Sequence, residues 1–350
     1  MHNNLLNGHH RMELLTSPSS IFSALIDDLH HARESIDMEY YIFANDRTGG
    51  LFANLLCRKA KQGLRVRLIV DGFGSMSLSR SMAHKFVECG VEFTSHSLLR
   101  RARHHRKMAI IDGRIAHIGG INIADRYVVG NNLGAWYDAQ LRLSGGAVTA
   151  VARLFDYDFM MSEGAVCEVP LTYSHAGLEV VWSEARGGYA MAELLREVIA
   201  SARKRLLITT PYFMPPAGVM MQLSSAVARG VEVTIVVPER CDVWLLDHVM
   251  RRHVASAHAR GINIRICRGA FVHAKMGIVD DRSVVIGSAN LDARSLGLNH
   301  EIMAVVTNRY IVGAARGFAD RLLAHSSELK SRDKRSAIPG VICRCFENLL

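Results

Sequence analysis

The sequence lacks a hydrophobic segment long enough to cross a membrane. No uninterrupted apolar stretch approaches the ~18–20 residues that span a bilayer, and the N-terminus does not show the basic-then-apolar pattern of a secretion signal. We therefore expect that the chain does not cross a membrane.

Cysteine and proline are also scarce. The 7 cysteines among 350 residues are odd in number and mostly dispersed, without the paired spacing of a disulfide or zinc framework, which favours a reducing compartment. Only 7 prolines, together with a hydrophobic content of 49%, leave little room for disordered tracts and indicate a packed globular protein.

Acidic residues are outnumbered by basic ones. The 42 Lys and Arg residues against 33 Asp and Glu residues leave a net charge of +9, which favours a polyanionic partner such as nucleic acid, an anionic bilayer or a phosphate-bearing substrate. Aromatic residues make up only 7% and form no cluster interleaved with basic residues, so the sequence does not show the stacking surface of a protein that binds single-stranded nucleic acid.

The chain repeats itself. In each half an amphipathic helix before an Ala-Arg pair (residues 32–33 and 202–203) leads into a strand, and two later helices are followed by strands at glycines. These glycines are Gly63, Gly90, Gly230 and Gly261. The parallel order predicts two copies of one α/β domain, covering residues 1–165 and 166–350. The alternative is an unduplicated α/β protein, in which such glycines also recur.

The same unusual motif stands near the end of each half. It reads H-x-K-x4-D, followed six residues later by G-[GS]-x-N. Its residues are His105, Lys107, Asp112 and Asn122 in the first half, and His273, Lys275, Asp280, Ser288 and Asn290 in the second. Two matches at equivalent positions of a repeat are a strong signal.

The motif residues suit the chemistry of a phosphodiester. The strand period of two places the histidine and lysine of each motif on one face. One imidazole can attack phosphorus while the other supplies a proton to the departing alkoxide. The lysines are fixed cations for the phosphate oxygens, and Asn122, Ser288 and Asn290 can add hydrogen bonds. The sequence therefore predicts a site that needs no metal or other cofactor.

The motif aspartates, Asp112 and Asp280, complete the candidate catalytic set. Each lies an odd number of residues from its lysine, so on a regular strand its side chain faces away from the histidine. A structural salt bridge is therefore favoured over catalysis for both.

The paired motifs resemble the signature of the phospholipase D superfamily. The resemblance implies an α/β fold of two duplicated phospholipase D-type sandwich domains, packed around a pseudo-twofold axis with one shared active site. It also implies a two-step displacement through a phosphohistidine, with His105 as the nucleophile and His273 as the acid/base. The near-symmetry of the two halves does not by itself determine that order.

Further stretches are similar to the bacterial cardiolipin synthases, in a short form without N-terminal transmembrane helices. These stretches are residues 39–43, 66–71, 103–107, 119–123, 136–138, 210–213 and 288–295. In that family an acidic residue downstream of each motif holds a histidine through its second ring nitrogen, and Asp138 and Glu301 stand at the expected positions. The alternative is that both are ordinary solvated acids.

The resemblance implies transfer of a phosphatidyl group from one phosphatidylglycerol, or another phospholipid donor, to a second phosphatidylglycerol, with release of glycerol. The expected partners are anionic phospholipids, with no nucleic acid and no obligate protein partner. We expect peripheral contact with the cytoplasmic side of the bacterial membrane through apolar loops and basic residues, including Arg100, Arg101, Arg103 and Arg106. A solvated loop or a phosphate-guiding rim is the alternative for these arginines.

Four other functions are considered. A hydrolase that uses water, or another phosphatidyltransferase such as a phosphatidylserine synthase, would have the same catalytic centre, because pocket shape and water exclusion decide the acceptor. A metal-independent nuclease is less favoured because no aromatic stacking cluster is present. A non-catalytic lipid-binding protein is disfavoured because the histidines, lysines and asparagines of both motifs are intact.

Overall fold

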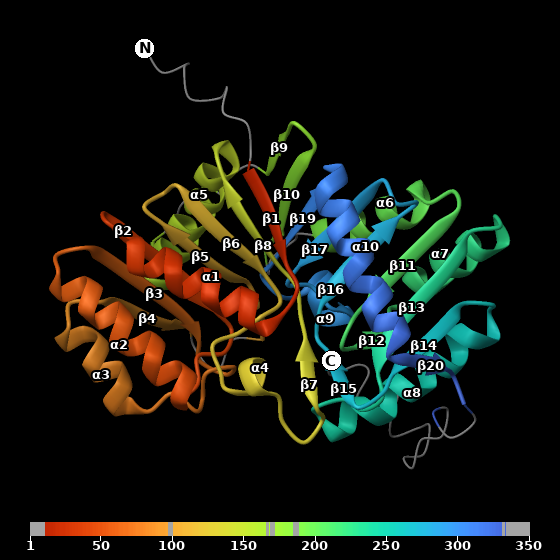
Figure 1. Cartoon of the computed structure of the whole chain (residues 1–350), viewed down its shortest axis with the longest axis horizontal. Coiled ribbons are helices and arrows are strands. Elements are labelled where there is room, and N and C mark those ends of the chain that lie inside the picture. Colours follow the sequence, from red (N-terminus) through yellow and green to blue (C-terminus); the bar gives the residue numbers. More distant parts are fainter. Residues whose placement is uncertain are drawn as a thin grey trace.

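A computed structural model of the chain describes residues 11–96, 101–165, 168, 172–184, 189–330 and 333. The first half contains a sheet made of β1 (Arg11–Leu15), β2 (Ser35–Tyr40), β3 (Arg65–Asp71), β4 (Glu92–His96), β5 (Lys107–Ile111), β6 (Ile115–Gly119) and β8 (Gln140–Ser144). Helices α1 (Pro18–His31), α2 (Arg47–Lys61) and α3 (Arg80–Glu88) cover one face of this sheet, and α5 (Gly146–Ser162) covers the other (Figure 1).

The second half contains a larger sheet. Its strands are β9 (Tyr173–His175), β10 (Leu178–Ser183), β11 (Arg205–Thr209), β13 (Glu232–Pro238), β14 (Asn263–Cys267), β16 (Lys275–Val279), β17 (Ser283–Gly287), β19 (Glu301–Val306) and β20 (Ser326–Glu328). Helices α6 (Ala190–Ser201), α7 (Ala217–Ala228) and α8 (Trp244–Ala259) pack on one face, and α10 (Arg309–Ala324) packs on the other.

Short elements complete the structure around the seam between the two halves. They are α4 (Arg126–Val129), β7 (Ala135–Tyr137), β12 (Phe213–Met214), β15 (Ala270–Val272), β18 (Leu291–Asp292) and α9 (Ala293–Gly297).

The strand order confirms the predicted duplication. The first sheet runs β1-β8-β6-β5-β2-β3-β4, and the second contains the corresponding order β10-β19-β17-β16-β11-β13-β14, with β9 and β20 added at its edges. In both halves the first strand after the amphipathic helix (β2 or β11) pairs in parallel with the next strand of the same sheet (β3 or β13) and antiparallel with the motif strand (β5 or β16). The predicted division at residues 165/166 falls between α5 and β9, and the exact boundary stays a prediction.

The predicted helix-to-strand junctions are also present. Helix α2 ends at Lys61 and β3 begins at Arg65, with Gly63 between them at a φ of 89°. In the second half α7 ends at Ala228 and β13 begins at Glu232, with Gly230 at a φ of 85°. This left-handed backbone conformation ends a helix and strongly favours glycine.

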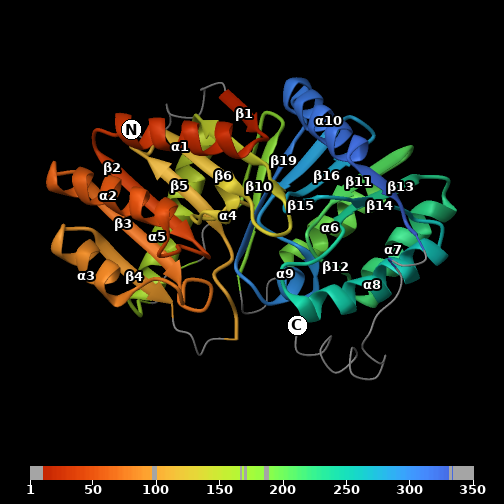
Figure 2. The ribbon, with the colours of Figure 1, turned by 60° about the horizontal axis from the view of Figure 1, so that its bottom comes forward.

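The two halves share a core and exchange backbone contacts. The inner faces of both sheets, together with α5 and α10, contribute to one buried apolar cluster, and β6 lies beside β19 (Figure 2). Strand β7 of the first half pairs in parallel with β15 of the second, and a β-bridge joins His104 to His300. These contacts bring the ends of the two motif strands together. None of the helices in the described part of the chain combines the length and apolar character that crossing a bilayer requires.

Candidate active site

His105 and His273 line one cavity of about 600 Å³ at the seam between the two halves. Each histidine lies two residues before the first residue of the motif strand of its own half, β5 or β16, and both side chains are buried. The backbone holds the two together, because His105 N donates to His300 O at 3.0 Å and His273 N donates to Tyr137 O at 2.7 Å. The structure thus brings the two predicted half-sites into a single site.

Each histidine is held by an acid from the opposite half of the chain. Nδ1 of His105 lies 2.9 Å from Oε1 of Glu301, and Nδ1 of His273 lies 2.6 Å from Oδ2 of Asp138. Both acids are fully buried. Because a carboxylate only accepts hydrogen bonds, this contact places the proton of each neutral imidazole on Nδ1 and leaves the lone pair on Nε2.

The motif lysines lie beside the histidines. Lys275 Nζ is 2.9 Å from Nε2 of His273, and it also donates to the backbone oxygen of His273 at 2.6 Å. Lys107 Nζ donates to the backbone oxygen of His105. Both lysines are almost completely buried, so two cations stand close to the two imidazoles.

Burial is the main cause of the shifted pKa values at the site. Burial lowers the pKa of His105 to about 4 and that of His273 to about 3, although the neighbouring carboxylates act in the opposite direction. It also lowers the pKa of Lys275 to about 8 and that of Lys107 well below its usual range. Glu301 keeps its charge, because His105, Lys107 and Ser288 overcome the effect of burial and lower its pKa to about 2. At neutral pH both imidazoles are therefore neutral and poised to gain charge when an anion binds.

Two of the three predicted phosphate-binding residues line the cavity, and the third supports one of the buried acids that hold the histidines. Asn122 and Asn290 line the cavity, and Oδ1 of Asn290 is buried without a hydrogen-bond partner among the described residues. The side chain of Asn122 is already engaged, because it accepts from Ile42 N at 3.0 Å and donates to Tyr127 OH at 2.7 Å. Ser288 instead donates to Glu301 and accepts from Ile302 N, so it supports the acid that holds His105.

A glycine takes the place of Ser288 in the first motif for a steric reason. A Cβ added to Gly120 would lie 2.4 Å from Oδ1 of Asp138. Only a residue without a side chain therefore lets Asp138 reach His273, whereas in the second half the serine hydroxyl donates to the acid.

Asp112 and Asp280 do not lie with the rest of the candidate catalytic set. Asp112 accepts backbone N–H groups of residues 33–35, and Asp280 accepts those of residues 203–205, at the junctions that lead into β2 and β11. These bonds overcome the effect of burial and lower the pKa of Asp280 to about 2. Both aspartates therefore stabilise the fold at the far end of the motif strand. The expected salt bridge is present for Asp280, which pairs with Arg282.

Arg106 is not part of a basic surface, contrary to our expectation. Its side chain is fully buried and donates to Asp158, to Glu184 and to the backbone oxygens of Ser183 and Glu301. A buried guanidinium with this many acceptors joins the two halves behind the histidines. Arg100 lies outside the described residues.

One group of possible metal ligands lies near this arginine. Side-chain atoms of His104, Asp158 and His300 come within 4.8 Å of one another. The Arg106 guanidinium already donates to Asp158 and supplies a positive charge there, so the group is part of an ion-pair network.

Aromatic residues around the histidines were missed as site residues. The Tyr41 ring packs edge-on against His105, with the ring centroids 4.9 Å apart. Tyr127 and Trp136 pack against His273 at 5.2 Å and 5.3 Å. Tyr41 and Trp136 belong to the stretches that resemble the family, which was the only sequence signal for them.

Known proteins resemble the chain in sequence and in fold. Residues 25–141 and 195–323 match the family described as "Cardiolipin synthase, PLD-like domain". The chain is 29% identical to the probable cardiolipin synthase YwiE of Bacillus subtilis, covering 93% of this chain and 68% of the relative. It is 32% identical to cardiolipin synthase 2 of Bacillus anthracis, covering 83% of this chain and 60% of the relative.

A solved structure resembles the whole chain. Phosphatidylserine synthase of Haemophilus influenzae has a TM-score of 0.78 and 16% identity, with 96% of this chain and 92% of that chain covered. This likeness establishes the fold, and it agrees with the two copies of one α/β unit described above.

Proposed function

The chain belongs to the family of cardiolipin synthases with phospholipase D-like domains, and on that premise we propose that it makes cardiolipin. The reaction transfers a phosphatidyl group from one phosphatidylglycerol, or another phospholipid donor, to a second phosphatidylglycerol and releases glycerol. The observation that carries the proposal is the single cavity into which His105 and His273 open, each held by an acid from the other half.

In the first step of the proposed reaction Nε2 of His105 attacks the phosphorus of the donor. The phosphorus–nitrogen bond forms while the bond to the departing glycerol oxygen breaks, and His273 supplies the proton that this oxygen takes up. The donor phosphate is an anion, so its binding raises the pKa of His273 from its low value and favours the protonated form. Lys275, 2.9 Å from Nε2 of His273, is the stronger base and keeps its own proton, so it stays a cation beside the phosphate while His273 takes up its proton from solvent.

In the second step a glycerol hydroxyl of the second phosphatidylglycerol attacks the same phosphorus. His273 accepts the hydroxyl proton, and the bond from phosphorus to His105 breaks with its electron pair returning to the imidazole. Lys107, Lys275 and Asn290 stabilise the charge on the non-bridging oxygens in both steps. Asp138 and Glu301 hold the imidazoles in one tautomer and stabilise the charged forms that develop.

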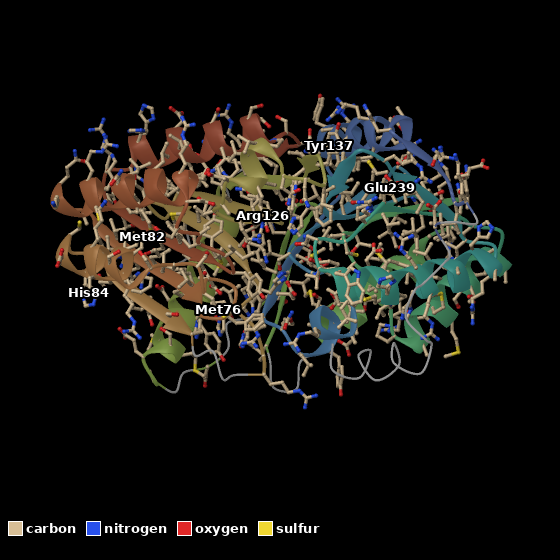
Figure 3. All side chains as sticks on the ribbon, turned by 90° about the horizontal axis from the view of Figure 1, so that it is seen from below. Met76, Met82, His84, Arg126, Tyr137 and Glu239 are labelled. Atoms are coloured by element: carbon tan, nitrogen blue, oxygen red, sulfur yellow. The ribbon has the colours of Figure 1, made fainter. Side chains whose placement is uncertain are left out.

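The rim of the cavity supports peripheral contact with a bilayer. Large apolar residues that line the cavity, or stand within two positions of a lining residue in the sequence, are exposed in both halves: Phe73 by 44%, Met76 by 64%, Val129 by 80%, Val243 by 45% and Trp244 by 69%. Phe73 and Val243 line the cavity itself. Seen from below, Met76 and Arg126 both project onto the middle part of the molecule, between the outer helices of the two halves (Figure 3). An apolar rim around a cationic cavity suits an anionic leaflet, and the scarcity of paired cysteines favours the cytoplasmic side.

The experiment that tests the proposal is incubation of the purified protein with labelled phosphatidylglycerol in anionic vesicles, without added metal. Lipid products are resolved by mass for the wild type, His105→Ala and His273→Ala. His84→Ala, on α3 and far from the cavity, is the matched control (Figure 3). We expect cardiolipin and glycerol from the wild type and the control only. Phosphatidic acid alone would make the protein a hydrolase, and no lipid turnover would overturn the proposal.

A further inference from the structure

Arg126 is a cation of the cavity that the two-histidine chemistry does not use. It lies on α4, four residues after Asn122, and its side chain lines the cavity. Its Nε is buried without a hydrogen-bond partner among the described residues. Although burial acts in the opposite direction, Tyr127 and the more distant carboxylate of Asp242 raise the pKa of Arg126, so the guanidinium keeps its charge. A buried guanidinium nitrogen without an acceptor loses free energy unless an anion supplies one.

The position of Arg126 is on the His273 side of the cavity. Its Cζ lies 5.4 Å from the centre of the Tyr127 ring and 5.6 Å from that of Trp136. These two rings pack directly against His273. The guanidinium of Arg126 and the imidazole of His273 therefore contact the same two aromatic rings.

Two other arginines of the cavity lie on the opposite side. Arg103 is two residues before His105 and stacks on Phe73 at 4.2 Å. Arg294 donates to the backbone oxygen of Arg101 at 2.6 Å, close to the same segment. Arg103 and Arg294 line the same cavity as Arg126. Arg103 and Arg294 therefore lie on the His105 side of the cavity, and Arg126 lies on the His273 side.

The chemistry of the proposed reaction requires a second anion on the His273 side. The same imidazole protonates the departing oxygen and deprotonates the incoming hydroxyl, so the acceptor enters where the glycerol leaves. A phosphatidylglycerol acceptor carries its own phosphate at the other end of the attacking glycerol. That phosphate must therefore lie in the same cavity, one glycerol length from the reacting phosphorus.

We propose that Arg126 binds the phosphate of the acceptor phospholipid and so selects a phospholipid over water or a neutral alcohol. Asp242, which accepts from Tyr212 OH, lines the cavity as well and is placed to accept from a free glycerol hydroxyl. The acceptor oxygen forms its bond to phosphorus as the bond to Nε2 of His105 breaks, and its proton goes to Nε2 of His273. This inference rests on the proposed synthase activity.

The test compares two acceptors in one enzyme. Exchange of labelled free glycerol into phosphatidylglycerol uses the same donor and the same histidines, but its acceptor carries no charge. Cardiolipin formation uses the charged acceptor. We expect Arg126→Gln to lower the ratio of cardiolipin formation to glycerol exchange by about 10-fold or more, the effect of losing a charge-assisted hydrogen bond. Arg126→Lys, which keeps the charge, should restore part of the ratio.

Arg294→Gln is the matched control, because it removes an arginine from the opposite side of the same cavity, and its ratio should stay that of the wild type. A ratio that Arg126→Gln leaves unchanged, with both activities lowered by the same factor, would overturn the inference. An equal fall of the ratio in Arg294→Gln would also overturn it, since the effect would then follow the total charge. Failure of the synthase proposal can be distinguished from failure of this inference, because in the first case the wild type itself would make no cardiolipin.

Discussion

Nδ1 of His105 lies 2.9 Å from Oε1 of Glu301, a residue 196 positions further along the chain. The reciprocal contact joins His273 to Asp138, 135 positions before it. Neither half therefore contains a complete histidine–acid pair of its own, and the catalytic geometry exists only when the two halves are packed together.

We expect Glu301→Gln and Asp138→Asn each to lower kcat by roughly 100-fold or more, because the amide no longer holds the imidazole in one tautomer or stabilises its charged form. The measurement is cardiolipin formation at saturating lipid. Thermal unfolding of both variants controls for folding, since each acid is buried. A variant that folds and keeps wild-type kcat would contradict the positioning role.

The covalent intermediate should lie on His105. After rapid acid-free quenching of the enzyme with labelled phosphatidylglycerol, mass spectrometry should find a phosphatidyl group on the peptide that contains this residue. The histidine phosphoramidate is labile to acid, so brief acid treatment should release the label. A label on the peptide that contains His273 would reverse the two roles.

The activity should depend on pH through His105 and Lys275. His105 must be neutral to attack, and burial lowers its pKa to about 4, so kcat/KM falls as the pH drops through about 4. Burial lowers the pKa of Lys275 to about 8, so its charge is lost as the pH rises through about 8. We expect a plateau of kcat/KM between these values.

Lys275→Arg tests the assignment of the alkaline limb. Arginine stays protonated throughout this range, so the fall of kcat/KM should move to higher pH even if the maximum rate is lower. An alkaline limb that stays at the same pH in this variant would show that another group causes it.

Trp244 should report contact with a bilayer. It is 69% exposed, whereas Trp136 and Trp182 are only 2% and 4% exposed. Anionic vesicles should therefore shift the tryptophan emission to shorter wavelength in the wild type and not in Trp244→Phe. Trp244→Asp should weaken co-sedimentation with vesicles. Tyr310→Asp, at a residue 70% exposed on α10, is the control, and an equal loss in that variant would argue against a specific rim.

Gly120→Ala should lower activity by about 10-fold or more without preventing folding. The added Cβ would lie 2.4 Å from Oδ1 of Asp138, and the displaced carboxylate would lose its contact with His273. The control is Gly218→Ala in α7, where a Cβ meets nothing within 4 Å and alanine favours the helix. Cardiolipin formation and thermal unfolding distinguish the two. Normal activity in Gly120→Ala would mean that the site relaxes around the new methyl group.

The duplication and the motif residues follow from the sequence itself. Hydrophobic periodicity, helix-ending glycines such as Gly63 and Gly230, and the strand period of two are local properties, so they predict the repeated elements and the shared face of each histidine and lysine. The odd spacing of Asp112 and Asp280 from the lysines likewise predicts that these residues face away. Resemblance to the family added Asp138 and Glu301 as candidate partners of the histidines.

Only the tertiary structure decided which side chains meet. The crossed pairs His105–Glu301 and His273–Asp138 depend on how the two sheets pack, because no local pattern records contacts between residues so far apart. The burial of Arg106 in an ion-pair network and the placement of Arg126 beside the rings that contact His273 have the same origin. The sequence does not show whether an arginine side chain is exposed to water, paired with a carboxylate or directed into a cavity. Only the packing of the chain determines its surroundings.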